Sequence, residues 1–351
     1  MKKLFFTIAF ATLSIALLNS NQLRADDSKK VLIEKSFTIN PEANLVVNHE
    51  YGNVYCNNWD KNEISVTIIA YAKTNDSEKA EKAFQRINWE AKGNSNEVIV
   101  QSKLTGKSGG GSPNVWTDIE INFPKSININ LRHKFGKAFV ETVDGIALIT
   151  SDYGSITVNK INNPESKFKV TYGDGQINTF LGGSFIVQYS QLTFDKAGDV
   201  SIRSEYSDVE GDEAGNILIK LEGGSLNLDK IIGIKGTSSF SSINIDQLSS
   251  SIDITTGYGS FNADQVSENF TEINVENNFG SVNLGIPASS SYIFDATATN
   301  GSIVYPEDIA NINYQEKTTQ KTILQGNIGQ NSKAAAKVTL KSNYGSINIV
   351  K

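Results

Sequence analysis

The segment "INVENNFGSVNL" (residues 273–284) shows the pattern that decides the fold. Two alternating aliphatic residues lead to an aromatic residue and a glycine, and two more alternating aliphatic residues follow. The segments "IDITTGYGSFNA" (residues 252–263) and "VTLKSNYGSINI" (residues 338–349) repeat the pattern. Twelve positions occupy the aromatic place, which we call the corner: Tyr51, Phe135, Tyr153, Tyr172, Tyr189, Tyr206, Gly223, Phe240, Tyr258, Phe279, Asn300 and Tyr344.

The corners recur at a nearly constant interval. From Phe135 to Phe240 successive corners are 17 to 19 residues apart, and the later intervals are 18, 21, 21 and 44 residues. Such a period is typical of solenoids, in which each repeat buries its apolar face on its neighbours. We therefore predict an all-β, single-chain parallel β-solenoid, resembling a right-handed β-helix because parallel crossovers are almost always right-handed, with a small β-α-β insertion near the N-terminus.

Each repeat must bend at its corner. Ile252 and Ile254 have even numbers, whereas Phe261 and Ala263 have odd ones. Side chains alternate along a strand, so a straight strand would place these pairs on opposite faces. Both pairs reach one core only if the chain turns between them, and we expect the flanking glycines to supply the positive φ that the turn requires.

Residues 1–25 have the features of a secretory signal peptide. Lys2 and Lys3 precede an apolar run over residues 4–18, and Ala25 is a suitable cleavage position. The run is too short to span a bilayer, so no integral membrane segment is expected after its removal. The predicted division is residues 1–25 as signal peptide, 26–130 as first repeat and capping insertion, and 131–351 as solenoid repeats continuous with that part.

The remaining chain is acidic. The net charge of −6 includes three cations of the predicted signal peptide, Lys2, Lys3 and Arg24, so the mature chain of 351 − 25 = 326 residues carries −6 − 3 = −9. A nucleic-acid partner is not expected, because phosphates require the opposite sign. Cys56 is the single cysteine and lies in a strand-like segment, which favours a small core residue over a nucleophile.

Two segments interrupt the repeats. Between the first two corners we predict strands over residues 63–72, 97–104 and 117–124, a helix over residues 76–87, and a flexible loop over residues 105–114. This insertion is predicted to cover the exposed sheet edge at the N-terminal end. After Asn300, the polar segment "NINYQEKTTQ" (residues 311–320) is expected to form a side loop that precedes the last repeat.

Side chains at equivalent places in successive repeats should form columns on the surface. The corner aromatics form one such column, either a structural stack or a platform for sugar rings. A polar column is either a binding surface or a row of amides that bond to one another; structure is favoured in both cases. The polar column is predicted to contain Asn178, Asn227, Asn244, Asn262, Asn283 and Asn348, with Thr157 and Thr193 in the same register.

The charged residues and histidines offer few candidates for a chemical site. Arg132 and Arg203 are isolated, and His49 and His133 each lie two residues before a corner, where we expect unrelated surface positions. Aspartates that follow the second strand of several repeats could form a carboxylate row for Ca²⁺, although turn formation explains them better. These are Asp195, Asp229, Asp246 and Asp264. No catalytic, cofactor-binding or metal site is predicted.

The segment "NLVVNHEYGNVYCNNWDKNEISVTI" (residues 44–68), the strand ending at Pro124 and the serial "YGSI"-type corners resemble the bacterial putative-adhesin family of β-strand repeat proteins. The resemblance covers about residues 45–351. It implies an exported β-solenoid and supplies no catalytic motif. Serine follows the corner at Tyr189, Tyr206 and Phe240, which departs from the regular pattern.

The leading functional hypothesis is an exported, non-enzymatic adhesin or cell-envelope interaction scaffold in the periplasm, at the cell surface or outside the cell. Its partner would be a surface glycan or an envelope protein. Two alternatives stay open: a carbohydrate-active β-helix that binds or cleaves polysaccharides, with Arg203 or Asp229 at its site, and a periplasmic envelope-stress or assembly component.

Overall fold

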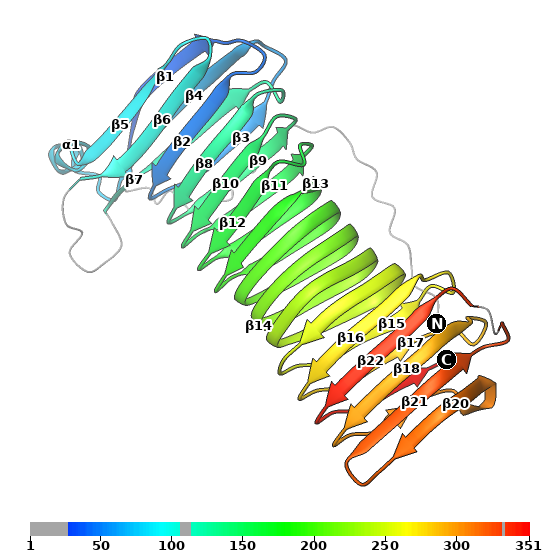
Figure 1. The fold of residues 1–351 in the computed structure, drawn as a ribbon. Coiled ribbons are helices and arrows are strands. Elements are labelled where there is room, and N and C mark those ends of the chain that lie inside the picture. The colour runs from blue at the N-terminus through cyan, green and yellow to red at the C-terminus, as the bar shows by residue number, and fades with distance from the viewer. Residues whose placement is uncertain (1–26, 106–113, 332–333) are drawn as a thin grey trace, which may run out of the picture.

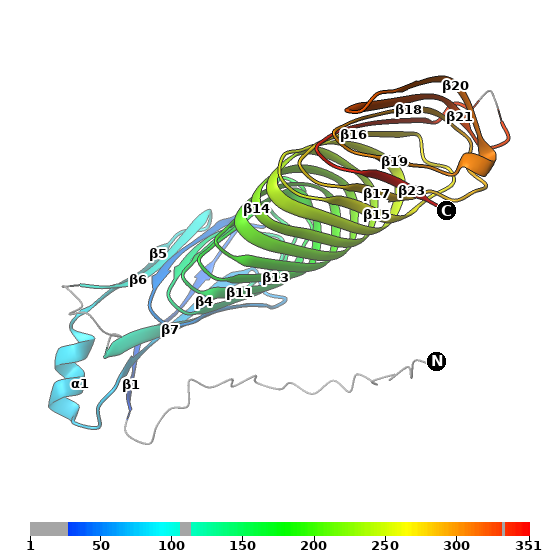
Figure 2. The same cartoon turned by 90° about the horizontal axis from the view of Figure 1, so that it is seen from below.

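The computed structural model describes residues 27–105, 114–331 and 334–351, so the predicted signal peptide and most of the predicted 105–114 loop lie outside the described residues. The described chain is an elongated body in which 23 strands belong to one sheet of mixed orientation (Figure 1). The sheet winds around a continuous apolar core (Figure 2). The all-β prediction is therefore confirmed.

The elements follow one another in three groups. The N-terminal group comprises β1 (Ser28–Thr38), β2 (Asn44–Glu50), β3 (Val54–Asn58), β4 (Glu63–Ala72), α1 (Ser77–Phe84), β5 (Ile87–Gly93), β6 (Glu97–Leu104) and β7 (Val115–Phe123). The central group comprises β8 (Asn128–Lys134), β9 (Lys137–Val143), β10 (Ala147–Asp152), β11 (Ser155–Ile161), β12 (Lys167–Thr171), β13 (Asp174–Gln188), β14 (Gln191–Thr256) and β15 (Phe261–Val266). The C-terminal group comprises β16 (Glu272–Asn278), β17 (Val282–Gly285), β18 (Tyr292–Thr299), β19 (Ile303–Val304), the 3-10 helix η1 (Glu307–Ile309), β20 (Ala310–Lys317), β21 (Lys321–Ile328), β22 (Lys337–Asn343) and β23 (Ile347–Val350).

Consecutive central repeats pair in parallel and in register. Ile149 in β10 lies opposite Leu131 in β8 on one side and opposite Phe168 in β12 on the other. After the corner, β11 likewise pairs in parallel with β9 and β13. Equivalent apolar residues therefore stack on one another along the body.

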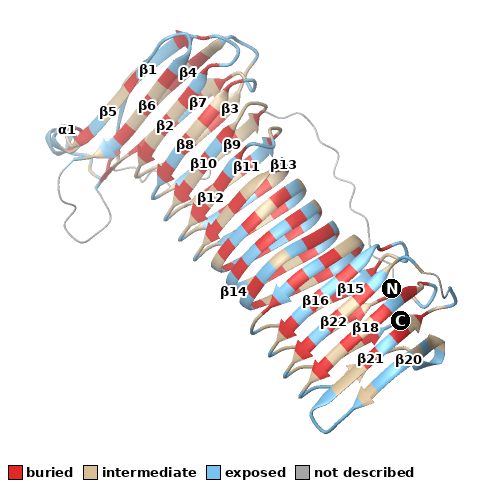
Figure 3. Cartoon of the chain, viewed as in Figure 1, coloured by how far each residue is buried: buried red, intermediate tan, exposed pale blue. Residues whose placement is uncertain are grey.

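The predicted change of facing at each corner is confirmed. Ile252 and Ile254 before the corner and Phe261 and Ala263 after it are all buried in the same core. Buried and exposed residues alternate along the strands (Figure 3). Complete burial of one such aliphatic side chain stabilises the fold by about 1.5–3 kcal/mol.

At most corners the corner residue itself adopts the left-handed conformation, which the prediction did not expect, whereas at Tyr258 the following Gly259 has the positive φ, 154°, as predicted. Among the non-glycine corners, φ lies between 48° and 64° at every one except Tyr258. The corners that serine follows share this conformation. A bulky residue with positive φ is rare and must be held by its surroundings, and here neighbouring repeats supply that support.

The glycine after the corner has a different role. A Cβ atom at Gly136 would lie 1.8 Å from the carbonyl oxygen of Gly52 in the adjacent repeat. At Gly280 a Cβ would lie 1.9 Å from the carbonyl oxygen of Gly259. These distances are far below van der Waals contact, so glycine is required because neighbouring backbones approach closely.

At the N-terminal end the first repeat lies inside the stack rather than at its edge. β2 pairs in parallel with both β8 and β6, and β3 with both β9 and β7. The predicted strands in this region correspond to β4, β6 and β7, and the predicted helix to α1, which Asp76 caps by accepting bonds from the N–H groups of Glu78 and Lys79. The sequence did not predict β1, which pairs with β4, or β5, which pairs with β6.

The C-terminal end has a similar interleaved order, and the predicted side loop was wrong. Most of the segment 311–320 forms β20, which pairs with β21, and β21 pairs antiparallel with β18. The last repeat of the sequence lies between two earlier ones, because β22 pairs with β16 and β18 while β23 pairs with β17 and β19.

Two of the outermost strands, β1 and β20, carry features that hinder further strand addition. The register of β1 shifts between Val31 and Ile33, and its exposed residues include Lys29 and Lys30. The register of β20 shifts between Ile312 and Tyr314. Bulges and charged side chains at a sheet edge disfavour pairing with another chain.

Within the described ranges, the single α-helix is too short and too polar to cross a membrane.

Candidate functional site

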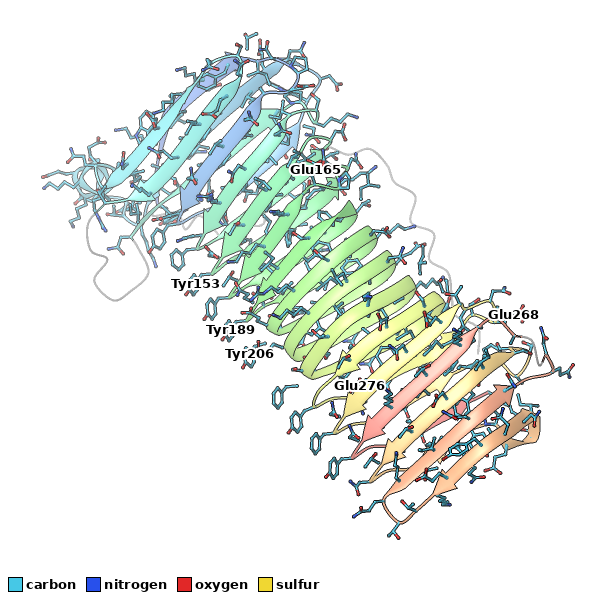
Figure 4. The ribbon with its side chains drawn as sticks, viewed as in Figure 1. Tyr153, Glu165, Tyr189, Tyr206, Glu268 and Glu276 are labelled. Atoms are coloured by element: carbon cyan, nitrogen blue, oxygen red, sulfur yellow. The ribbon has the colours of Figure 1, made fainter. Side chains whose placement is uncertain are left out.

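The corner aromatics form two stacks of rings along one edge of the body (Figure 4). We call them together the aromatic ladder. Neighbouring ring centroids lie 4.7–5.4 Å apart and the ring planes differ by at most 17°. The first stack contains Tyr51, Phe135, Tyr153, Tyr172, Tyr189 and Tyr206, and the second contains Phe240, Tyr258, Phe279 and Tyr344.

The ladder is structural and exposed at once. Because each ring inside a stack lies face to face with its neighbours, its faces are covered and its edge meets solvent. Apart from Tyr51, the ladder side chains have exposed fractions that range from 40% at Phe135 to 65% at Phe240. Each stacked pair contributes about 0.5–1.5 kcal/mol beyond the burial of its area. An inner ring therefore offers little free face to a sugar.

Two corners have no ring: Asn300, which lies beyond Tyr344 at the end of the ladder, and Gly223, which interrupts it. The φ of Gly223 is 77°, so its backbone resembles that of the aromatic corners. The preceding ring belongs to Tyr206 and the following ring to Phe240, each 17 residues away. The Tyr206 ring leans over the glycine, since a Cβ at Gly223 would lie 2.7 Å from its Cδ1 atom.

An open hollow of about 420 Å³ adjoins the first stack. Tyr153 and Tyr172 form part of its wall, and Lys137 and Asp174 carry charges on its lining. This hollow gives a polar ligand access to the edges of two ladder rings.

The predicted polar column is present from Asn227 onward. The amide nitrogen of Asn244 donates to the Oδ1 atom of Asn227 at 2.8 Å, and Asn262 donates to Asn244 at 2.7 Å. Asn283 and Asn348 continue the series at 2.6 and 2.7 Å. The amides therefore bond along the sheet, as the structural interpretation predicted. Each amide keeps one N–H and one acceptor lone pair for other partners.

The assignment of Asn178 to this column was wrong. Asn178 instead donates to the Oδ1 atom of Asn159 at 3.2 Å. Thr157 and Thr193 both lie opposite Gln176, two residues earlier in the strand. The register is unshifted here, and Asn178 lies six residues after its corner, Tyr172, whereas the other members of the column lie four residues after theirs.

His49 and His133 are buried neighbours, so the expectation of unrelated surface positions was wrong. Their rings stack with centroids 5.2 Å apart, and their Nδ1 atoms are 3.1 Å apart. The Nε2 atom of His49 lies 2.8 Å from the carbonyl oxygen of Thr117. A carbonyl only accepts, so His49 carries its proton on Nε2 and accepts at Nδ1 from the Nδ1–H of His133.

Burial disfavours the charged form of both histidines. It lowers the pKa of His49 to about 3, with a further contribution from His133, while the Thr117 hydrogen bond opposes the shift. Burial also lowers the pKa of His133 to about 4. The pair is therefore neutral and structural at neutral pH.

The remaining candidates do not form a cluster. Asp195, Asp229, Asp246 and Asp264 are exposed, as is Arg132. Arg203 pairs with Glu205 at 2.7 Å. No group of three or more His, Cys, Asp or Glu side chains suited to a metal occurs among the residues that the structure describes. Cys56 is fully buried in β3, as predicted for a core residue, and burial raises the pKa of its thiol to about 12.

Comparison with solved structures finds similar chains of low sequence identity. A "putative cell adhesion protein" from Clostridium sporogenes is 11% identical, with 91% of this chain and 99% of that chain covered and a TM-score of 0.19. A "putative adhesin" from Parabacteroides merdae is 11% identical, covers 72% and 94%, and has a TM-score of 0.31. A "putative lipid binding protein" from Parabacteroides distasonis is 12% identical, covers 72% and 94%, and has a TM-score of 0.30.

No protein-family model and no curated protein matches the chain. One of these three neighbours is named an adhesin and another a cell adhesion protein. Membership of this chain in the family that the sequence resembles stays a prediction.

Proposed function

We propose that the chain is an exported, right-handed parallel β-solenoid that acts as an adhesin or as an interaction scaffold of the cell envelope, without enzymatic activity. The observation that carries this proposal is the aromatic ladder, which is exposed along one edge of the body. The in-register parallel pairing of the central repeats supports the solenoid. The partner would be a surface glycan or an envelope protein.

Export of the chain by means of a signal peptide is part of the same proposal. Residues 1–25 would be removed as a signal peptide, residues 26–130 would hold the first repeat and the cap, and residues 131–351 would hold the remaining repeats. Mass spectrometry of the protein from its native envelope should then find an N-terminus at Asp26. An intact N-terminus at Met1 in the mature protein would contradict export by this route.

Cell fractionation combined with surface protease accessibility tests the location. An adhesin must be cleaved by protease added to intact cells, whereas a periplasmic component is protected until the outer barrier is opened. Protection in intact cells would favour the envelope-assembly alternative and contradict adhesion.

Binding of the mature chain to immobilised glycans and matrix proteins tests the activity. A variant with Tyr206→Ala and Tyr344→Ala removes two exposed rings that each end a stack, and a variant with Leu148→Ala removes an exposed apolar side chain elsewhere. Adhesion through the ladder predicts weaker binding for the first variant alone. Equal binding by all three proteins would contradict a role for the ladder.

The insertion is proposed to cover the N-terminal end of the core. Phe37 of β1 and Ile64, Val66 and Ile68 of β4 belong to the main core, whereas Ala80 and Phe84 of α1 pack in a small separate cluster. Replacing residues 75–88 with a short Gly-Ser turn should therefore destabilise the chain by about 2–4 kcal/mol through loss of buried Phe84 and Ile87 and should promote association. Urea unfolding and light scattering measure both effects. A monomeric variant of unchanged stability would contradict the cap assignment.

A further inference from the structure

The two stacks of the aromatic ladder face each other across Gly223. Tyr206 has a stacked neighbour, Tyr189, on one side, and Phe240 has a stacked neighbour, Tyr258, on the other. No stacked ring contact joins Tyr206 to Phe240 in the described part of the chain. One face of each ring is therefore unpaired, unlike the ring faces inside the stacks. We call the space over Gly223, between these two rings, the Gly223 notch.

The notch has the dimensions of one missing ring. Adjacent repeats of a parallel sheet are about 4.8 Å apart, so two repeats separate the planes of Tyr206 and Phe240 by about 9.6 Å. A flat ring inserted midway would lie about 4.8 Å from each wall, which matches the spacing inside the ladder. The Phe240 side chain is the most exposed aromatic of the ladder, at 65%.

The Tyr206 ring covers Gly223, which is buried, and so fills part of the notch. It leans toward the Cβ position that Gly223 lacks, and its centroid is 5.4 Å from Tyr189, the widest spacing in the ladder. Rotation about the two side-chain bonds of this exposed tyrosine returns the ring toward Tyr189. The notch can therefore open without movement of the backbone.

The rim of the notch is polar on both sides. Glu205 and Glu222 precede the corners at Tyr206 and Gly223, and Glu205 accepts hydrogen bonds from Gln188 and Arg203. After the corners, the hydroxyl of Ser225 donates to Asp208 at 2.6 Å. Such a rim offers acceptors and donors to hydroxyl groups, and its carboxylates disfavour an anionic ligand. Aromatic walls with a few convergent polar groups are typical of ligand sites.

We propose that the Gly223 notch binds one pyranose ring of a neutral glycan, with the C–H faces of the sugar against Tyr206 and Phe240 and its hydroxyl groups toward the polar rim. This inference rests on the proposed function, because it assigns a place and a chemical class to the glycan partner named there. The inner rings of the ladder, whose faces are covered, would contribute little to the same binding.

Calorimetric titration of the mature chain with cellohexaose, chitohexaose and mannohexaose tests the proposal, with N-acetyltyrosinamide as an aromatic probe. Gly223→Tyr should complete the ladder, since the other corners accept a ring in this backbone conformation, and should lower the affinity for the bound sugar more than tenfold. Phe240→Ala removes one wall without filling the notch and should lower the affinity about tenfold. Tyr153→Ala, inside the first stack, should bind within twofold of the unaltered chain.

Three outcomes would overturn the proposal: no binding of any of the three sugars at millimolar concentration, equal binding by the Gly223→Tyr variant, or binding of N-acetyltyrosinamide alone. The last would assign the notch to an aromatic side chain of a protein partner. Failure here is separable from failure of adhesion. A Gly223→Tyr variant that still adheres leaves the proposed function standing without the notch, and sugar binding by a strictly periplasmic protein leaves the notch without adhesion.

Discussion

Replacing Gly280 with alanine is expected to lower the free energy of unfolding by about 3 kcal/mol or more. The new Cβ would lie 1.9 Å from the carbonyl oxygen of Gly259 in the adjacent repeat. Both atoms belong to or adjoin the backbone, so relief requires the two repeats to separate locally and to weaken their interstrand hydrogen bonds. Urea unfolding of the mature chain, followed by circular dichroism, measures the loss.

Gly257→Ala is the matched control for this prediction. It lies beside the corner of the preceding repeat, and the nearest atom to its added Cβ is the Oγ atom of Ser239 at 3.4 Å. The control should change the stability by less than about 1 kcal/mol, because neither a clash nor a positive φ opposes it. Equal losses in the two variants would show that close approach of the backbones is not the reason for the glycine.

Acid is expected to destabilise the fold through the buried histidine pair. The unfolded histidines have a pKa near 6.5, whereas the folded ones titrate near 3 and 4. The unfolded state therefore binds more protons below pH 6.5. The stabilisation from the neutral pair is complete above that pH and is lost as the pH falls toward 4 and 3. Between pH 7.5 and pH 5 the pair should lose about 4 kcal/mol.

The variant with His49→Asn and His133→Asn isolates this effect. Asparagine is suited to the place, because Asn277 occupies the equivalent buried position before the corner at Phe279. Urea unfolding at several pH values should show a shallower acid dependence for the variant. Asp118 acts in the opposite sense, since burial raises the pKa of its carboxyl to about 6, and it is common to both proteins. Identical acid dependence would contradict the assignment to the histidines.

The repeats were predictable because their pattern is local. Alternation of Ile252 and Ile254, and the change of parity at Phe261, required a bend between two inward faces. The same parity rule also places in the core the residue that lies two positions before each corner. Asn277, for example, follows Ile273 and Val275 in steps of two. Applied to His49 and His133, the rule would have predicted their burial. Their polarity suggested the surface, but hydrogen bonds to each other and to Thr117 satisfy three of their four ring nitrogens inside, and only the Nε2 atom of His133 has no partner among the described residues.

The order of repeats at the two ends was not predictable from the pattern. The last repeat could have lain at the edge of the sheet, but β22 lies between β16 and β18. Nothing in the local sequence of β22 and β23 distinguishes these two positions. That order depends on long-range pairing and on the hairpin of β20 and β21, whose polar sequence resembles a loop because both strands lie near the end of the sheet. The unpaired ring faces at Gly223 were likewise visible only after the neighbouring rings had been placed.

The placement of β22 and β23 has a consequence for how the protein reaches its final state. The strands β18, β20 and β21 at the C-terminal end are synthesised before β22 and β23, which join this end to the rest of the body. A chain that emerges from N- to C-terminus therefore cannot complete this end until β22 and β23 are available. Termination of synthesis before β22 should leave an open seam that proteases can attack.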